Sequence, residues 1–327
     1  MLDLEQISFV GDRLARPECV LATSDGTLHV SDWRGGVTTI RKDGSQTSIL
    51  AKGEFRPKPN GIAIHPKGGW LLAHLGDTDG GVYRLYPDGA LKPVLLDIDN
   101  APLPPTNYVH VDDLGRIWAT VSTRKQPRSL GYRSDCNDGF VVLLDGSGAR
   151  VVADGLGYTN ECLIHPTTRQ LFVNETFARR TLRFDVADNG KLGNKMVVAT
   201  YGHGTYPDGL CFDTEGGFWI TSIVSNRLIR VDANGRQTVV LEDVDRDQLD
   251  HVEAAYLAGT MGRPHLDRTF GRVLGNISSA AFGGTKLRTL YLGCLLGSSL
   301  ATAESPVQGA EPFHWHWDPF QVEGEAP

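Results

Sequence analysis

The chain has 327 residues, of which 40% are hydrophobic and 22% charged, and its formal net charge is −7 at pH 7. This composition is that of a globular protein and excludes a disordered or fibrous chain, and no run of Lys or Arg is long enough to follow a nucleic-acid backbone. Because no apolar stretch approaches the ~20 residues that span a bilayer and residues 1–5 do not resemble a secretion signal, we expect a cytoplasmic protein that binds neither nucleic acid nor a membrane.

Glycine and proline are scattered along the chain, with 38 Gly and 17 Pro. This distribution favours many short strands joined by tight turns over long helices. The five cysteines are widely separated and form no C-x-x-C pair, which indicates buried free thiols rather than a zinc site or a disulfide framework.

A repeated pattern of strands and glycine turns runs through the chain. Its first copy begins at Glu18, and further copies begin at Asn60, Asn107, Asn160, Asp208 and Ser279. The first five starts lie 42, 47, 53 and 48 residues apart, and the sixth follows after 71. A period of this length is typical of the four-stranded blade of a β-propeller. The sequence therefore predicts an all-β, six-bladed propeller with antiparallel blades, forming a single domain over residues 1–327.

The predicted strands follow one another with polar turns between them. In chain order, the clearest are residues 7–10, 27–32, 70–74, 82–85, 116–120, 171–174, 181–185, 218–221, 227–232 and 289–293. We expect the strand at 7–10 to close the ring by pairing with blade six, which removes an exposed sheet edge. The long sixth spacing predicts an insertion over residues 243–275 between blades five and six, with a helix at 247–257 and a possible role as a lid.

The residues that begin the blades all carry oxygen donors in their side chains, and in a propeller the first strand of each blade lines the central channel. Glu, Asp and Asn side chains that meet there would suit a hard divalent ion such as Ca²⁺, Mg²⁺ or Mn²⁺, and would tolerate Zn²⁺. For any single position, the alternative is that the polar residue only serves the preceding turn. The repetition over six blades favours a shared site.

Three segments resemble one known family. They are Tyr206–Asp213 followed by Gly217–Ile220, then Asn226–Asp232, and Ala281–Gly284 before Leu290–Leu292. These segments are the most specific part of a resemblance that covers residues 18–294. The family that this stretch resembles is that of the senescence marker protein, gluconolactonase and luciferin-regenerating enzyme, whose members are six-bladed propellers.

The resemblance implies a role for each matching position. It implies that Glu18, Asn160 and Asp208 hold one divalent metal ion, that Asn107 contacts the substrate and that Asn60 completes the ring. It further implies a metal-dependent hydrolase acting on a small lactone or ester, in which the metal polarises the carbonyl and Asp208 also serves as the base that activates water.

Two positions depart from the family pattern. Pro105 stands where sugar-lactone members have an arginine, so a lactone other than gluconolactone is expected. Glu161 replaces the usual glycine after the fourth-blade asparagine, and we expect it to pair with an arginine within the sheet or to reach the substrate as a second acid or base.

Histidines offer two further candidates. His203 lies five residues before Asp208, in a loop expected to reach the channel mouth, and is a candidate for substrate contact. The alternation of His314 and His316 predicts a strand with both imidazoles on one face, which indicates packing at the ring closure or a weak metal site.

Two other functions remain compatible with this architecture. One is phosphotriester hydrolysis, as in similar propellers, and the other is a non-enzymatic binding propeller. Carboxylates that converge in the channel argue against the second. The oligomeric state is not predicted by the sequence.

Overall fold

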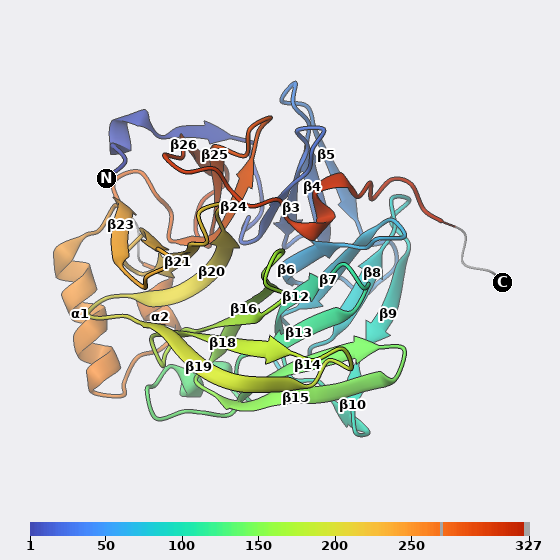
Figure 1. Ribbon diagram of the computed structural model, residues 1–327, viewed down its shortest axis with the longest axis horizontal. Helices are drawn as coiled ribbons and strands as arrows, with labels where there is room; N and C mark the ends of the chain where they lie inside the picture. The colour runs from blue at the N-terminus through green and yellow to red at the C-terminus, as the bar shows by residue number, and fades with distance from the viewer. Residues whose placement is uncertain (269–270, 324–327) are drawn as a thin grey trace.

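The computed structural model describes residues 1–268 and 271–323, so residues 269–270 of the predicted insertion and the end of the predicted domain at 324–327 lie outside the described residues. Six four-stranded antiparallel sheets are arranged around a common centre, which confirms the predicted six-bladed propeller (Figure 1). The innermost strands β2, β6, β12, β16, β20 and β24 contact one another in turn, and β24 contacts β2.

The first five blades follow the chain order from the innermost strand outward. Blades one and two contain β2 (Val20–Ala22), β3 (Leu28–Asp32), β4 (Gly36–Ile40), β5 (Gln46–Leu50), β6 (Pro59–Ile64), β7 (Trp70–His74), β8 (Val82–Leu85) and β9 (Leu91–Leu95). Blade three contains β12 (Thr106–Val111), β13 (Ile117–Val121), β14 (Gly139–Asp145) and β15 (Gly148–Leu156). Blades four and five contain β16 (Thr159–Ile164), β17 (Leu171–Glu175), β18 (Arg180–Val186), β19 (Leu192–Thr200), β20 (Tyr206–Phe212), β21 (Phe218–Ile223), β22 (Arg227–Val231) and β23 (Gln237–Glu242).

Blade six joins the two ends of the propeller. It contains β24 (Ile277–Gly283), β25 (Thr289–Cys294), β26 (Leu300–Glu304) and, as its outermost strand, β1 (Ser8–Val10). Strand β1 pairs antiparallel with β26, with Ser8 opposite Thr302 and Val10 opposite Leu300. The predicted ring closure is therefore confirmed, because residues from the first part of the chain complete the last blade.

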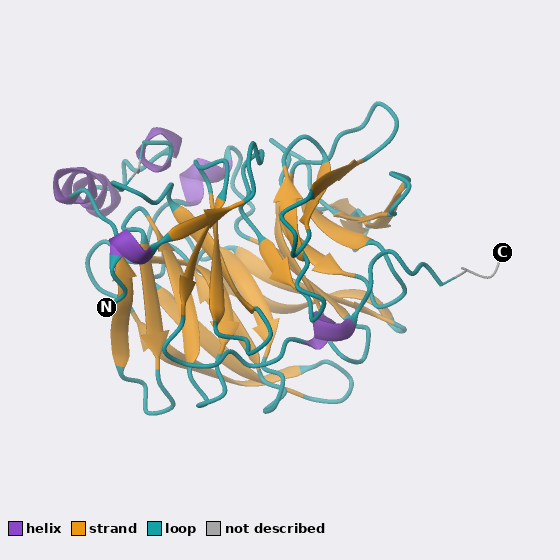
Figure 2. Ribbon diagram, turned by 90° about the horizontal axis from the view of Figure 1, so that it is seen from above, coloured by secondary structure: helices purple, strands orange, loops and turns teal. Residues whose placement is uncertain are grey.

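The helices lie outside the six sheets, in a molecule otherwise built from strands (Figure 2). The insertion contains α1 (Arg246–Leu257) and α2 (Arg263–Leu266), which confirms the predicted helix, and Asp245 caps α1 by accepting a hydrogen bond from the Gln248 amide. Short 3₁₀ helices occur at η1 (Leu4–Gln6), η2 (Arg128–Gly131) and η3 (Phe313–His316). None of the helices in the described part of the chain is long and apolar enough to cross a membrane.

Two local features differ from the sequence-based expectations. The predicted strand at His314–Trp317 is wrong, because this segment folds as the 3₁₀ helix η3, which buries Trp315 and leaves the His316 side chain 69% exposed against Glu311. A small hairpin of β10 (Asp97–Ile98) and β11 (Ala101–Pro102) was not predicted.

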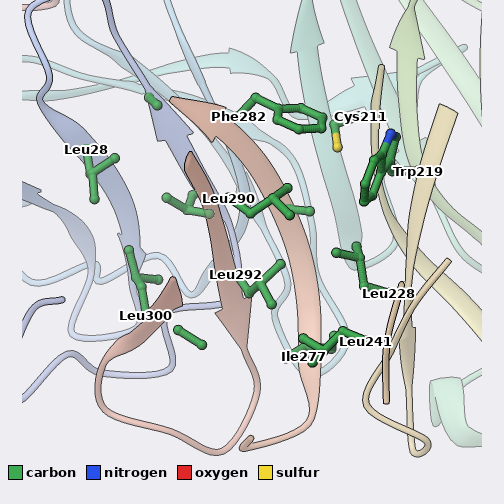
Figure 3. Close-up of a cluster of buried hydrophobic side chains, with 14 of the residues drawn as sticks. Leu28, Cys211, Trp219, Leu228, Leu241, Ile277, Phe282, Leu290, Leu292 and Leu300 are labelled. Carbon is green, nitrogen blue, oxygen red and sulfur yellow. The ribbon is translucent and has the colours of Figure 1, made fainter. Parts of the chain in front are cut away.

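The hydrophobic core fills the spaces between neighbouring blades. Figure 3 shows one such cluster, in which Leu290 and Leu292 of blade six lie between Leu28 of blade one and Trp219 of blade five. Burial of these apolar side chains contributes most of the stability expected of such a fold. The indole of Trp219 donates to the Asp213 carboxylate at 2.8 Å, so the buried polar atom is also satisfied.

Candidate functional site

The side chains that converge at one mouth of the channel come from irregular points of the inner strands. Regular pairing is interrupted between Pro59 and Ile62, Thr106 and Tyr108, Thr159 and Cys162, Pro207 and Leu210, and Ile277 and Ser279. A bulge re-aims the side chain of the residue that it contains. These interruptions contain Asn60, Asn107, Asn160, Asp208 and Ser278, which explains how five blades direct a polar side chain to the same place.

Glycines next to two of these residues allow the inner strands to approach closely. A Cβ atom on Gly61 would lie 2.5 Å from the Tyr108 ring, and one on Gly209 would lie 2.5 Å from the Ser278 carbonyl oxygen. Only glycine fits at both positions without a backbone shift. The spacing of the strands therefore depends on these two residues.

Five of the residues predicted for the site line a single cavity, open to solvent, at the channel mouth. They are Glu18, Asn60, Asn107, Asn160 and Asp208, with relative exposures of 7%, 3%, 5%, 5% and 4%. From blade six, Ser278 rather than Ser279 lines the space directly beneath them, and its hydroxyl donates to the Glu18 carbonyl oxygen at 2.9 Å.

The two carboxylates of the site have different electrostatic surroundings. One oxygen of Glu18, Oε2, accepts from Nε and Nη2 of Arg16 at 3.0 and 2.7 Å. Burial raises the pKa of Asp208 well above its usual range, the charge of Glu18 raises it further, and Arg16 and the Asn160 amide oppose these effects. Two acidic groups thus meet in a buried place where a cation would stabilise both of their ionised forms.

The donor set of this cavity fits a hard divalent ion. The described residues contain no group of three His, Cys, Asp or Glu side chains placed to hold a metal, since the site has two carboxylates accompanied by amides. The amide oxygen of Asn60 is buried and has no hydrogen-bond partner within the described structure. Such an orphaned acceptor is costly, and a cation bound among carboxylate and amide oxygens would satisfy it.

Two hydrogen bonds orient the asparagine side chains. The Asn160 amide nitrogen donates to the Thr176 hydroxyl at 2.9 Å, which leaves its carbonyl oxygen as an acceptor. The Asn60 amide nitrogen lies 3.5 Å from Asn107 Oδ1, an arrangement that leaves the Asn107 amide nitrogen as a donor.

Glu161 lies behind the site cavity. It is 6% exposed and lines both the space beneath the ring and an apolar cavity at the other end of the channel. Its Oε2 accepts from the Leu210 amide at 2.8 Å, and no described arginine pairs with it, so the expected ion pair within the sheet is wrong. Burial raises the pKa of Glu161 well above its usual range, the charges of Asp208 and Glu18 raise it further, and the hydrogen bond from the Leu210 amide opposes these effects.

His203 is placed apart from the residues that line the cavity. Its side chain is 56% exposed, and its Nε2 lies 3.4 Å from Asp250 on α1. The structure therefore does not bring His203 together with the other predicted site residues.

The walls of the cavity contain residues that the sequence analysis missed. Three arginines, Arg16, Arg128 and Arg263, line it, together with the aromatic residues Tyr132, Tyr158 and Phe177. They come from loops and from α2 of the insertion, outside the repeated strand pattern, so the repeat offered no signal for them. The insertion forms part of the wall through Arg263 and Leu266.

Comparison with known proteins identifies the family. Residues 16–243, which include Glu18, Asn107, Asn160 and Asp208, match the family model described as the SMP-30/gluconolactonase/LRE-like region. The chain belongs to this family. The resemblance inferred from the sequence motifs is thereby confirmed. The family model does not cover α1, α2 or blade six of this SMP-30/gluconolactonase-like chain.

Solved structures extend the likeness to nearly the whole chain. A gluconolactonase from Xanthomonas campestris is 20% identical, with a TM-score of 0.65 over 93% of this chain and 89% of that one. A luciferin-regenerating enzyme is 13% identical, with a TM-score of 0.64 over 95% of this chain and 99% of that one. A calcium-binding protein, regucalcin from Agrobacterium tumefaciens, is 14% identical, with a TM-score of 0.65 over 92% of this chain and 96% of that one. At these identities the comparison shows a shared fold.

Proposed function

We propose that this chain is a metal-dependent hydrolase that opens a small lactone or ester, with one divalent ion held by Glu18, Asn160 and Asp208. The observation that carries the proposal is the convergence of two buried carboxylates and an unpartnered amide oxygen on one cavity. Membership of the SMP-30/gluconolactonase family supports the hydrolase, and the similar fold of a protein described as calcium-binding supports the metal.

Each of the cavity residues can take a separate role in hydrolysis. When bound, a divalent ion supplies a Lewis acid that polarises a carbonyl oxygen and lowers the pKa of water. Asp208 accepts the proton of the attacking water through its carboxylate. Asn107 donates its amide N–H to the substrate, since its oxygen already faces Asn60. Tyr132, Tyr158 and Phe177 wall the cavity and reduce the access of bulk water, which strengthens these polar interactions.

The test combines removal of metal with a substrate panel. The protein is treated with a chelator and assayed for acid release from a series of lactones and esters, with Ca²⁺, Mg²⁺, Mn²⁺ or Zn²⁺ added back singly. We expect the activity on at least one lactone to disappear with the chelator and to return with one or more of the ions. A phosphotriester in the same panel distinguishes the other hydrolytic chemistry, and failure of every substrate with every ion would contradict the proposal.

A further inference from the structure

Positive charge is concentrated on the wall of the site cavity. Arg16 comes from the segment before blade one, Arg128 from η2 in the loop between β13 and β14, and Arg263 from α2 of the insertion. All three line the same cavity, so their positive charges face one shared space.

Two of these arginines have an acidic partner within the protein. Arg16 pairs with Glu18 at 2.7 Å, and Arg263 Nε lies 2.8 Å from Asp267 Oδ1. Arg128 differs, because its partly buried guanidinium makes no hydrogen bond or ion pair with any residue in the described part of the chain. Burying a charged guanidinium without a partner costs free energy, unless a bound ligand compensates for the lost solvation.

The groups around Arg128 do not neutralise it. Burial lowers the pKa of Arg128, and Tyr158, Tyr132, Glu18 and Asp77 raise it. Phenol side chains carry no charge at neutral pH, and burial raises the pKa of Tyr158 well above its usual range. The Glu18 carboxylate is engaged by Arg16, and the Asp77 side chain is 89% exposed and lies 3.1 Å from Lys58 Nζ.

The charge of the occupied site leads to the same conclusion. A divalent ion would balance the carboxylates of Glu18 and Asp208. Arg16 and Arg128 would then remain as two positive charges in excess, since Arg263 has Asp267. A substrate with one anionic group would offset one of them, and because Arg16 keeps Glu18 Oε2 at 2.7 Å, Arg128 is the arginine left to bind it. Arginine is the residue best suited to hold a carboxylate through two parallel hydrogen bonds.

We propose that the substrate is a lactone that carries a second, ionised carboxyl group, and that Arg128 binds this carboxylate while the lactone carbonyl lies at Glu18, Asn160 and Asp208. This inference rests on the hydrolase proposed above and specifies the class of its substrate. Tyr132, Tyr158 and Phe177 form an aromatic wall beside Arg128, with ring centroids 4.7 to 5.3 Å apart and exposures of 2%, 5% and 1%. Such a rigid wall fits the flat face of a small ring.

The experiment compares matched lactones and matched variants. The values of kcat/KM are measured for glucaro-1,4-lactone, which has a free carboxylate, and for the neutral glucono-1,4-lactone, which has the same ring size. We expect the wild-type protein to prefer the carboxylate-bearing lactone by about tenfold or more, as one charged hydrogen-bonding pair contributes about that factor. Arg128→Gln should remove most of this preference and Arg128→Lys should keep part of it. The control is Arg124→Gln, in the same loop, whose exposed side chain pairs with Asp154 at 2.8 Å and should keep the full preference.

Equal kcat/KM values for the two lactones, or equal preferences in the Arg128→Gln and Arg124→Gln variants, would overturn the inference while leaving the hydrolase proposal in place. A stronger preference for a phosphorylated lactone would overturn the assignment of the anion as a carboxylate.

A binding measurement separates the two proposals. Tetrahydrofuran-2-carboxylate and its neutral counterpart tetrahydrofurfuryl alcohol are titrated calorimetrically into the wild type and the Arg128→Gln variant. We expect only the carboxylate to bind, with at least a tenfold loss of affinity in the variant. Binding of this kind without hydrolysis of any lactone would contradict the proposed function but support the carboxylate site, whereas equal binding of both compounds would count against the site itself.

Discussion

Arg179 and Glu253 form a two-point ion pair that fastens the helical insertion to blade four. Arg179 Nη1 lies 2.8 Å from Glu253 Oε1, and Nη2 lies 2.5 Å from Oε2. Glu253 also accepts from the Gly204 amide at 3.0 Å and from the Tyr206 hydroxyl at 3.1 Å. Helix α1 is thus held against the propeller by a buried carboxylate whose hydrogen bonds are all made. This contact also anchors the insertion, whose second helix α2 places Arg263 in the cavity wall.

Removal of this carboxylate should weaken the fold. In the Glu253→Gln variant, the partly buried guanidinium of Arg179 loses its counter-charge, and we expect the free energy of unfolding to fall by about 3 kcal/mol. Urea denaturation measures the change. Arg246→Gln serves as the control, since Arg246 pairs with Glu242 through a side chain that is 63% exposed, and it should change stability by less than about 1 kcal/mol. Equal losses in the two variants would show that the buried pair has no special role.

Asp208 is expected to be essential for both metal binding and turnover. Asp208→Asn keeps the shape of the side chain but removes the charge that binds a divalent ion and the base that accepts the proton of water. We expect no measurable turnover and at least a tenfold weaker metal affinity by calorimetric titration, which corresponds to about 1.4 kcal/mol. Asp77→Asn, at a position whose side chain is 89% exposed, is the control and should retain both turnover and metal affinity. Full activity of Asp208→Asn would exclude it as a ligand and base.

Asn107 should act mainly in substrate binding. Because its oxygen faces Asn60 and its amide nitrogen is left to donate, Asn107→Ala removes a hydrogen bond to substrate without removing a carboxylate. We expect KM to rise about tenfold with a much smaller change in kcat, since one hydrogen bond contributes roughly 1 kcal/mol or somewhat more. Steady-state kinetics measures the effect, and Asn189→Ala, at an exposed position, is the control that should keep the wild-type values. A large fall in kcat at constant KM would instead place Asn107 in the chemical step.

The sequence could predict the site residues that occupy equivalent positions in successive blades. Glu18, Asn60, Asn107, Asn160 and Asp208 stand at equivalent points of successive blades, so their convergence follows from the symmetry of the propeller. Strand β24 has the same kind of interruption as the other inner strands, and in it Ser278, one residue before the expected Ser279, takes the position that Asn107 has in β12.

The cavity wall could not be predicted in the same way. Arg16, Arg128 and Arg263 lie outside the repeated strands, in the segment before blade one, in η2 and in α2, and only the closed ring brings them to one cavity. Glu161 was expected to find an arginine because a buried carboxylate generally has a counter-charge. It is bonded instead by the backbone amide of Leu210 on the neighbouring inner strand.

Buried histidines should make the stability depend on pH below neutrality. His29 is 1% exposed, its Nδ1 accepts from the Trp70 indole at 3.2 Å, and burial lowers its pKa from the usual 6.5 to about 4, against the opposing charge of Asp25. Between pH 6.5 and 4 the unfolded chain binds a proton at this position and the folded protein does not. The unfolding free energy is therefore greatest above pH 6.5 and falls as the pH approaches 4, by about 3 kcal/mol for one such imidazole.

The variant His29→Gln tests this dependence, because glutamine can still accept the indole hydrogen bond but does not titrate. We expect its unfolding free energy, measured with urea at pH 7.5, 5.5 and 4.5, to vary less with pH than that of the wild type. A part of the slope should persist, since burial also lowers the pKa of His110 to about 4. His316→Gln, at a side chain that is 69% exposed, should keep the wild-type slope. An unchanged slope in His29→Gln would show that His29 is protonated in the folded state, and that the indole of Trp70 must then have another partner.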